Sequence, residues 1–171
     1  QIINYSHIVI PGVAAFETGS KFLLKNGFKE EIFNFAEKSR PILGLCLGCQ
    51  LLMEKSHEFG VHKGLGLIEG EVKKIDVKEK VKIPHVGWKN IKLENENQTS
   101  ILSNIEKNDF VYFTHSFVCN PINKINSLAS FSYGGNQLSA GIIKENIVGL
   151  QFHPELSGKV GRKILSNFLK I

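Results

Sequence analysis

The chain has 171 residues, of which 42% are hydrophobic and 22% are charged, and it carries a net charge of +5. These values are typical of one globular domain that needs no disulfide bonds, and they exclude disordered and collagen-like chains. No apolar run could cross a bilayer, the first residues resemble no targeting segment, and the lysines form no basic stripe with aromatic residues. We therefore expect a cytoplasmic protein with no membrane and no nucleic-acid partner. Three cysteines without a disulfide spacing agree with a reducing compartment.

The first half of the chain alternates between predicted strands and helices. A short buried strand ends at Pro11-Gly12, and two amphipathic helices follow it. Arg40-Pro41 ends the second helix, and another buried strand then runs directly into a third helix. The predicted ranges are 7–10, 17–28, 30–39, 42–45 and 47–55.

The second half is richer in strands and ends in an amphipathic helix. Strands are predicted over 67–77, 89–94, 110–114 and 128–132, followed by a hairpin over 139–152 that turns at 144–146 and a helix over 160–170. We expect an α/β fold, with an open mixed sheet flanked by helices, formed by a single domain over 1–171. Because the chain starts at Gln1 and its first strand lies within ten residues, we expect an N-terminal truncation that removes the first βα unit.

Gly44-Leu45-Cys46-Leu47-Gly48 lies between a predicted strand and a predicted helix and has the G-x-nucleophile-x-G pattern of a nucleophile elbow. The glycines let strand and helix pack around a strained turn. The turn places the Cys46 sulfur at a helix N-terminus, where we expect backbone N–H groups to lower its pKa. The N–H of Leu47 is then positioned to bind an oxyanion. The alternative is a buried structural cysteine.

Cys46-x-x-Cys49 also fits a redox pair or half of a metal site. Neither reading explains the glycines, and a zinc site needs a second pair of ligands that the sequence does not supply at a suitable spacing. We therefore expect no metal and no cofactor, with Cys49 as a small core residue.

A catalytic thiol needs a base, and His153 is the best placed of six histidines. The segment Gln151-Phe152-His153-Pro154-Glu155 ends an apolar strand, which fixes the imidazole with a carboxylate two residues further on. His153 is predicted to take the thiol proton and Glu155 to orient the ring. A simple loop turn is the alternative for this segment alone.

Together, Gly44-Leu45-Cys46-Leu47-Gly48-x-Gln50 and His153-Pro154-Glu155 resemble the class I, or triad, glutamine amidotransferases. Finer features, in the same order along the chain, are similar to the glutaminase subunit of imidazole glycerol phosphate synthase. These features are Pro11-Gly12-Val13-x-x-Phe16, Gly64-Leu65-Gly66-Leu67-Ile68-x-Gly70, Pro84-His85-Val86-Gly87-Trp88 and His115-Ser116-Phe117.

The resemblance implies roles for the matching residues. Cys46, His153 and Glu155 would form the catalytic triad, and the oxyanion would be bound by Leu47 and by the Gly12-Val13 peptide after it flips. Glutamine would be held by Gln50, Glu58, His115, Ser116 and Phe117. A (βα)8-barrel cyclase would dock on Pro84, His85 and Trp88 to form a heterodimer and would receive the ammonia.

Three departures from the family pattern stand out. Ala14 replaces a glycine beside the flipping peptide, and Leu156 replaces a lysine that pairs with an acid on the cyclase. The family's opening Asp-Tyr-Gly-x-Gly-Asn segment is absent from this sequence.

The resulting hypothesis is a glutaminase subunit that supplies ammonia for imidazole glycerol phosphate formation in histidine biosynthesis. A paralogue that feeds amidino-sugar formation on surface polysaccharides is the alternative, and Ala14 and Leu156 favour it. A catalytically silent scaffold would require a broken triad. A cysteine peptidase or redox sensor would leave Gln50 and Glu58 without a role.

Overall fold

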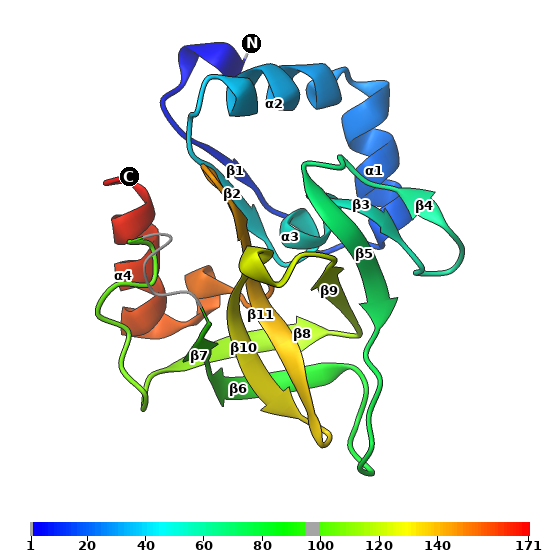
Figure 1. The fold of residues 1–171 in the computed structure, drawn as a ribbon, viewed down its shortest axis with the longest axis vertical. Helices are drawn as coiled ribbons and strands as arrows, with labels where there is room; N and C mark the ends of the chain where they lie inside the picture. Colours follow the sequence, from blue (N-terminus) through cyan, green and yellow to red (C-terminus); the bar gives the residue numbers. More distant parts are fainter. Residues whose placement is uncertain (1, 95–99) are drawn as a thin grey trace.

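The computed structural model describes residues 2–94 and 100–171 (Figure 1). Its central element is a six-stranded mixed sheet with the order β1-β2-β12-β11-β10-β7. The first three strands are parallel, and the others are antiparallel. The strands are β1 (Ile8–Ile10), β2 (Ile42–Leu45), β12 (Ile147–Leu150), β11 (Asn136–Lys144), β10 (Ser127–Tyr133) and β7 (Lys92–Leu93).

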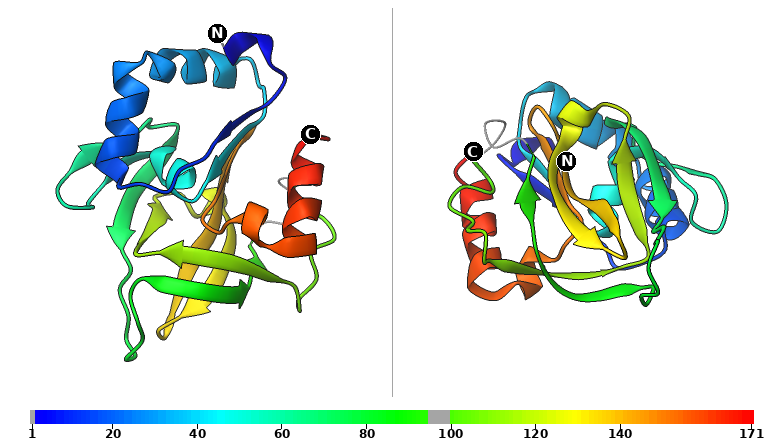
Figure 2. Two further views of the ribbon diagram at one scale, coloured as in Figure 1. Left: turned by 180° about the vertical axis from the view of Figure 1, so that it is seen from behind. Right: turned by 60° about the horizontal axis from the view of Figure 1, so that its bottom comes forward.

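Helices cover both faces of this sheet, as the back view in Figure 2 also shows. The alternation of side chains along β2 explains the two layers. Ile42 packs with residues of the helices that follow β1 and β2, whereas Leu43 and Leu45 pack with the C-terminal helix. The helices are α1 (Phe16–Lys25), α2 (Phe28–Glu37), α3 (Leu47–Leu51) and α4 (Gly158–Phe168). The expected fold class, an open mixed sheet flanked by helices, is confirmed.

Two smaller sheets complete the described fold. One has the order β4-β3-β5-β9, and the other pairs β6 with β8 at the end of the molecule opposite α2 (Figure 1). The strands are β3 (Met53–Ser56), β4 (His62–Lys63), β5 (Ile68–Lys74), β6 (His85–Asn90), β8 (Phe110–His115) and β9 (Phe117–Pro121). Short 3-10 turns are η1 (Ile2–Asn4), η2 (Lys124–Asn126) and η3 (Pro154–Leu156).

Two predicted elements are wrong in extent. The helix over 47–55 ends at Leu51, because Met53 begins strand β3 and pairs with Ile68 of β5. The strand over 89–94 is divided between the end of β6 and the two-residue β7. Strands β3, β4 and β9 were not predicted. Their pairing with distant segments decides their conformation, and local pattern does not reveal such pairing.

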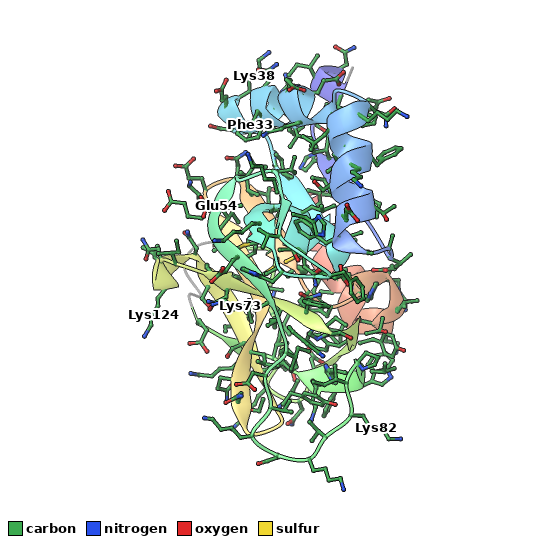
Figure 3. All side chains as sticks on the ribbon, turned by 90° about the vertical axis from the view of Figure 1, so that its right-hand side faces the viewer. Phe33, Lys38, Glu54, Lys73, Lys82 and Lys124 are labelled. Atoms are coloured by element: carbon green, nitrogen blue, oxygen red, sulfur yellow. The ribbon has the colours of Figure 1, made fainter. Side chains whose placement is uncertain are left out.

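The positive charge is spread over different elements. Figure 3 shows Lys38 after α2, Lys124 in η2 and Lys82 before β6 at widely separated points of the molecule. Among the described residues no helix is long and apolar enough to cross a membrane, and the longest, α4, has 11 residues.

Candidate active site

The turn between β2 and α3 carries Cys46 in a strained conformation. Its φ of 51° and ψ of −105° lie where few non-glycine residues are found. The flanking glycines make the turn feasible: a Cβ on Gly44 would lie 2.7 Å from the Gly48 backbone, and one on Gly48 would lie 1.6 Å from the Ile10 carbonyl oxygen. The G-x-Cys-x-G pattern thus allows β1, β2 and α3 to pack closely around the cysteine.

Strand β12 brings the second half of the site to this turn. It pairs in parallel with β2, so that Leu150 lies opposite Leu45, and the Leu150 carbonyl accepts a 2.8 Å hydrogen bond from the Cys46 N–H. The chain beyond β12 therefore passes directly beside the thiol. The N–H of His153 donates to the Tyr112 carbonyl at 2.8 Å, which fixes this segment against β8.

His153 and Glu155 form a close pair. The His153 Nδ1 lies 2.6 Å from Glu155 Oε1, with the imidazole buried and the carboxylate about half exposed. His153 Nε2 is buried and has no hydrogen-bond partner among the described residues, 2–94 and 100–171. A carboxylate on Nδ1 selects the tautomer that leaves Nε2 as an acceptor. His153 Nε2 is thus a buried ring nitrogen that is free to accept a proton.

Cys46 is 7% exposed, and its thiol lies close to polar groups of β8 and of the segment that follows β12. Its Sγ lies 3.9 Å from the Thr114 carbonyl oxygen and 3.8 Å from Nε2 of Gln151. Burial raises the pKa of the thiol to about 11, and the Glu155 charge adds to the rise, whereas the Leu47 N–H and Gln151 oppose it. The expectation of a lowered thiol pKa is therefore wrong, because desolvation outweighs the donors of the five-residue helix α3.

A backbone N–H group at the predicted oxyanion site is already hydrogen-bonded within the protein. The N–H of Leu47 donates to the Gly12 carbonyl at 3.4 Å. Val13, the next residue, is 87% exposed. In this conformation, the Gly12 carbonyl takes the donor that an oxyanion needs.

Two of the predicted glutamine-binding residues, Gln50 and Glu58, make different kinds of contact. Gln50 is buried, and its Nε2 donates to the Phe117 carbonyl and to Gln151 Oε1, each at 3.1 Å. Glu58 instead accepts a 2.6 Å hydrogen bond from the N–H of Phe16, the first residue of α1. Its carboxylate thus stabilises the helix N-terminus that follows the Gly12-Val13 segment.

His115 and Ser116 contribute to the wall of the site in different ways. His115 is buried, its Nδ1–H donates to the Phe117 carbonyl at 2.8 Å, and burial lowers its pKa to about 4. The Ser116 carbonyl accepts from the N–H of Ile75 at 2.8 Å and joins this segment to the end of β5. His115 is therefore neutral near pH 7 and supports the Phe117 backbone.

Of the predicted docking residues, Pro84 and Trp88 are exposed, whereas His85 is 2% exposed and lies in the core. Strand alternation explains the difference, because His85 and Trp88 point to opposite faces of β6. The His85 ring packs on Phe113, Phe131 and Tyr133. Its side chain therefore does not belong to the exposed surface, and Val86, which is 56% exposed, does.

Sequence reasoning gave no role to Gln151 or to the Thr114 carbonyl, although both contact the Cys46 thiol. Gln151 stands two residues before His153 at the end of a predicted strand. The signal was therefore present in the motif, but the parallel pairing of β12 with β2 was needed to place it beside Cys46.

Cys49 contacts Cys119 in the core. All three cysteines are free, and Cys49 Sγ lies 3.6 Å from Cys119 Sγ in the core. Within the part of the chain that the structure describes, no group of three or more His, Cys, Asp or Glu residues could hold a metal ion.

This arrangement combines a strained cysteine turn with a His–Glu pair on the segment that follows the neighbouring parallel strand of an α/β sheet, and it is typical of one class of enzyme. Residues 2–171 match the family described as glutamine amidotransferase class-I. The fold is also similar to the solved structure of a glutamine amidotransferase, with a TM-score of 0.70, 18% identity and coverage of 96% of this chain and 78% of that one. A structure of PurLQS from Thermotoga maritima gives a TM-score of 0.70 at 23% identity, covering 97% of this chain and 79% of the other.

Sequence relatives define the group more narrowly. The chain is 45% identical over 178 residues to imidazole glycerol phosphate synthase subunit HisH 1 of Legionella pneumophila (strain Lens), covering 100% of this chain and 84% of that protein. It is 43% identical over 168 residues to the HisH subunit of Caldanaerobacter subterraneus, covering 98% and 80%. The chain therefore belongs to the class I glutamine amidotransferases and, within them, to the HisH family.

Proposed function

We propose that the chain hydrolyses glutamine at Cys46 and delivers the ammonia to a (βα)8-barrel cyclase that forms imidazole glycerol phosphate. The observation that carries the proposal is the buried, unpaired His153 Nε2, with Glu155 held 2.6 Å from Nδ1, on the segment that follows the Leu150–Cys46 hydrogen bond. The free cysteines agree with a reducing compartment such as the cytoplasm.

The reaction begins with attack of Cys46 Sγ on the side-chain amide carbon of glutamine. His153 Nε2 accepts the thiol proton and gives it to the amide nitrogen, which leaves as ammonia. Water then attacks the γ-glutamyl thioester, and His153 takes a proton from that water and returns one to the sulfur as glutamate departs. Glu155 orients the imidazole and stabilises its cationic form.

The oxyanion site must open before this reaction is efficient. We propose that the Gly12-Val13 peptide rotates, so that the Gly12 carbonyl leaves the Leu47 N–H and the Val13 N–H becomes a second donor. Until then, the hydrogen bond between Leu47 and Gly12 blocks the site. Since one missing oxyanion donor costs about 10²–10³ in rate, we expect low activity without the partner.

The outer face of the β6–β8 sheet is the proposed docking surface. Its exposed apolar side chains are Val86, Trp88 and Phe110, and the Trp88 ring contacts that of Tyr112 at 5.6 Å. The same sheet reaches the thiol, because Thr114 of β8 has its carbonyl 3.9 Å from Cys46 Sγ. A barrel bound on this face could receive ammonia beside its source and keep it unprotonated.

The synthase role is preferred over amidino-sugar formation because the two relatives described above are imidazole glycerol phosphate synthase subunits. Ala14 and Leu156 bear on activation and docking, but they do not identify a different acceptor.

The test is glutamate release from glutamine by the chain alone and with the cyclase and its nucleotide ligand. Stimulation by at least tenfold is expected. The synthase assignment would be contradicted if the cyclase does not stimulate a folded chain whose Cys46 can still be alkylated. Glutamine hydrolysis would then be tested with another barrel protein.

A further inference from the structure

Gln151 lies between the candidate nucleophile and the candidate substrate-binding amide. It is 1% exposed, its Oε1 accepts from Gln50 Nε2 at 3.1 Å, and its Nε2 lies 3.8 Å from Cys46 Sγ. We infer that Gln151 is a positioning residue that links recognition of glutamine at Gln50 to the orientation and ionisation of the Cys46 thiol. This inference rests on the proposed function.

The backbone fixes Gln151 firmly in this place. Its own N–H donates to the Ala140 carbonyl of β11 at 2.9 Å, and the preceding Leu150 carbonyl accepts from the Cys46 N–H at 2.8 Å. Gln151 and Cys46 therefore follow the ends of adjacent parallel strands. Because hydrogen bonds fix the backbone on either side of Gln151, its side chain loses little conformational entropy when it orients the thiol.

The Oε1 end of Gln151 orients Gln50. A primary amide has two N–H donors, and Gln50 directs its donors to the Phe117 carbonyl and to Gln151 Oε1. The Gln50 oxygen is consequently its remaining hydrogen-bonding group for a substrate, and it is suited to the ammonium of glutamine. Without the Gln151 acceptor, only the Phe117 carbonyl of this pair of contacts would hold the Gln50 amide in its orientation.

The Nε2 end of Gln151 acts on the thiol. A donor directed at the sulfur favours the thiolate, and Gln151 indeed lowers the pKa of Cys46 against the larger effect of burial. The same contact also restricts rotation of the Cys46 side chain. The two ends of one amide thus serve two separable purposes, substrate recognition and activation of the nucleophile.

Two substitutions separate these purposes. Gln151→Glu keeps an acceptor for Gln50 but removes the donor to Cys46, so we expect kcat to fall about tenfold with KM changed by less than about threefold. Gln151→Met removes both contacts, so kcat should fall and KM should rise together. Both variants should slow alkylation of Cys46 at pH 8 by about tenfold or more, because the thiolate loses a donor and, in the Glu variant, also meets a carboxylate charge.

Glutaminase kinetics with the cyclase and iodoacetamide labelling, assigned to Cys46 by peptide mapping, provide the readouts. Gln137→Met on β11 is the matched control, since this exposed glutamine donates to Ser132 Oγ in a surface contact and its substitution should leave all values unchanged. If the Met variant does not fold, the kinetics and labelling of the isosteric Glu variant still test the inference.

Labelling rates and kcat within twofold of the wild type in the Glu variant would overturn the inference. A wild-type chain that releases no glutamate would instead contradict the proposed function, and the labelling comparison would still test the contact between Gln151 and the thiol.

Discussion

At the scale of single residues, the main feature is a nucleophile that rests in its protonated form. Burial raises the pKa of Cys46 to about 11, and the Glu155 charge contributes in the same direction. Such a thiol reacts only when a base removes its proton, and His153 Nε2 has no hydrogen-bond partner in the described structure. In the proposed mechanism the sulfur therefore stays protonated until the substrate and His153 are aligned.

The resting state of the thiol predicts how it responds to pH. Because only the thiolate is alkylated, the rate of iodoacetamide labelling at Cys46 should rise about tenfold per pH unit from pH 7 to 10, without a plateau near 8.5. Peptide mapping separates Cys46 from the buried Cys49 and Cys119. A labelling rate that levels off below pH 9 would contradict this account.

In the proposed mechanism Glu155 orients His153 and forms no bond to the substrate, so its removal should be less severe than loss of the nucleophile. We expect Glu155→Gln to lower kcat by about 10² while changing KM little. The free energy of unfolding should change by less than about 1 kcal/mol, because the carboxylate is half exposed. Steady-state kinetics and urea unfolding measure both values, and an unchanged kcat would exclude the orienting role.

At the scale of elements, local motifs could be predicted from the sequence, whereas strand pairings between distant segments could not. The Cys46 turn could be predicted because glycines, strand and nucleophile lie within five residues. The end of α3 could not, since Met53, Glu54 and Lys55 favour helix, and only pairing with β5 makes them a strand. His85 and Gln151 were placed only by the register of β6 against β8 and of β12 against β2.

The inward face of the β6–β8 sheet also predicts a pH dependence of stability. Burial lowers the pKa of His85 and of His115 to about 4, whereas unfolded histidine titrates near 6.5. Between these values the unfolded chain binds more protons, so the free energy of unfolding falls as the pH is lowered from about 6.5 to 4.

His85→Gln should make this fall shallower, by about 1–3 kcal/mol across the window. Urea unfolding followed by the fluorescence of Trp88, the one tryptophan of the chain, measures the effect. An equally steep fall in the variant would show that His85 is not one of the responsible groups.

At the scale of the whole molecule, one sheet joins the proposed docking surface to the Cys46 turn. The outer side chains of β6 and β8 are exposed, the inner ones form a histidine and aromatic core, and the carbonyl of Thr114 contacts the thiol. A partner bound on the outer face would therefore act on the same strand that contacts the nucleophile. This arrangement suits an enzyme that should release ammonia only into its partner.

Trp88 should dominate the binding of that partner, because exposed aromatic side chains supply much of the energy of protein interfaces. We expect Trp88→Ala to weaken cyclase binding by at least about 2 kcal/mol and to leave labelling of Cys46 unchanged. Calorimetric titration gives the affinity. The exposed Val61→Ala, in the β3–β4 turn, is the control, and equal effects of both variants would contradict the proposed surface.

The central claim is that Cys46 forms a covalent γ-glutamyl thioester. The direct measurement is mass spectrometry of the chain, acid-quenched during turnover of glutamine with the cyclase present, followed by peptide mapping. We predict a mass gain equal to glutamine less ammonia on the peptide that contains Cys46, and no gain and no glutamate release in Cys46→Ala. Glutamate release that persists in Cys46→Ala, or an adduct on another residue, would contradict the mechanism.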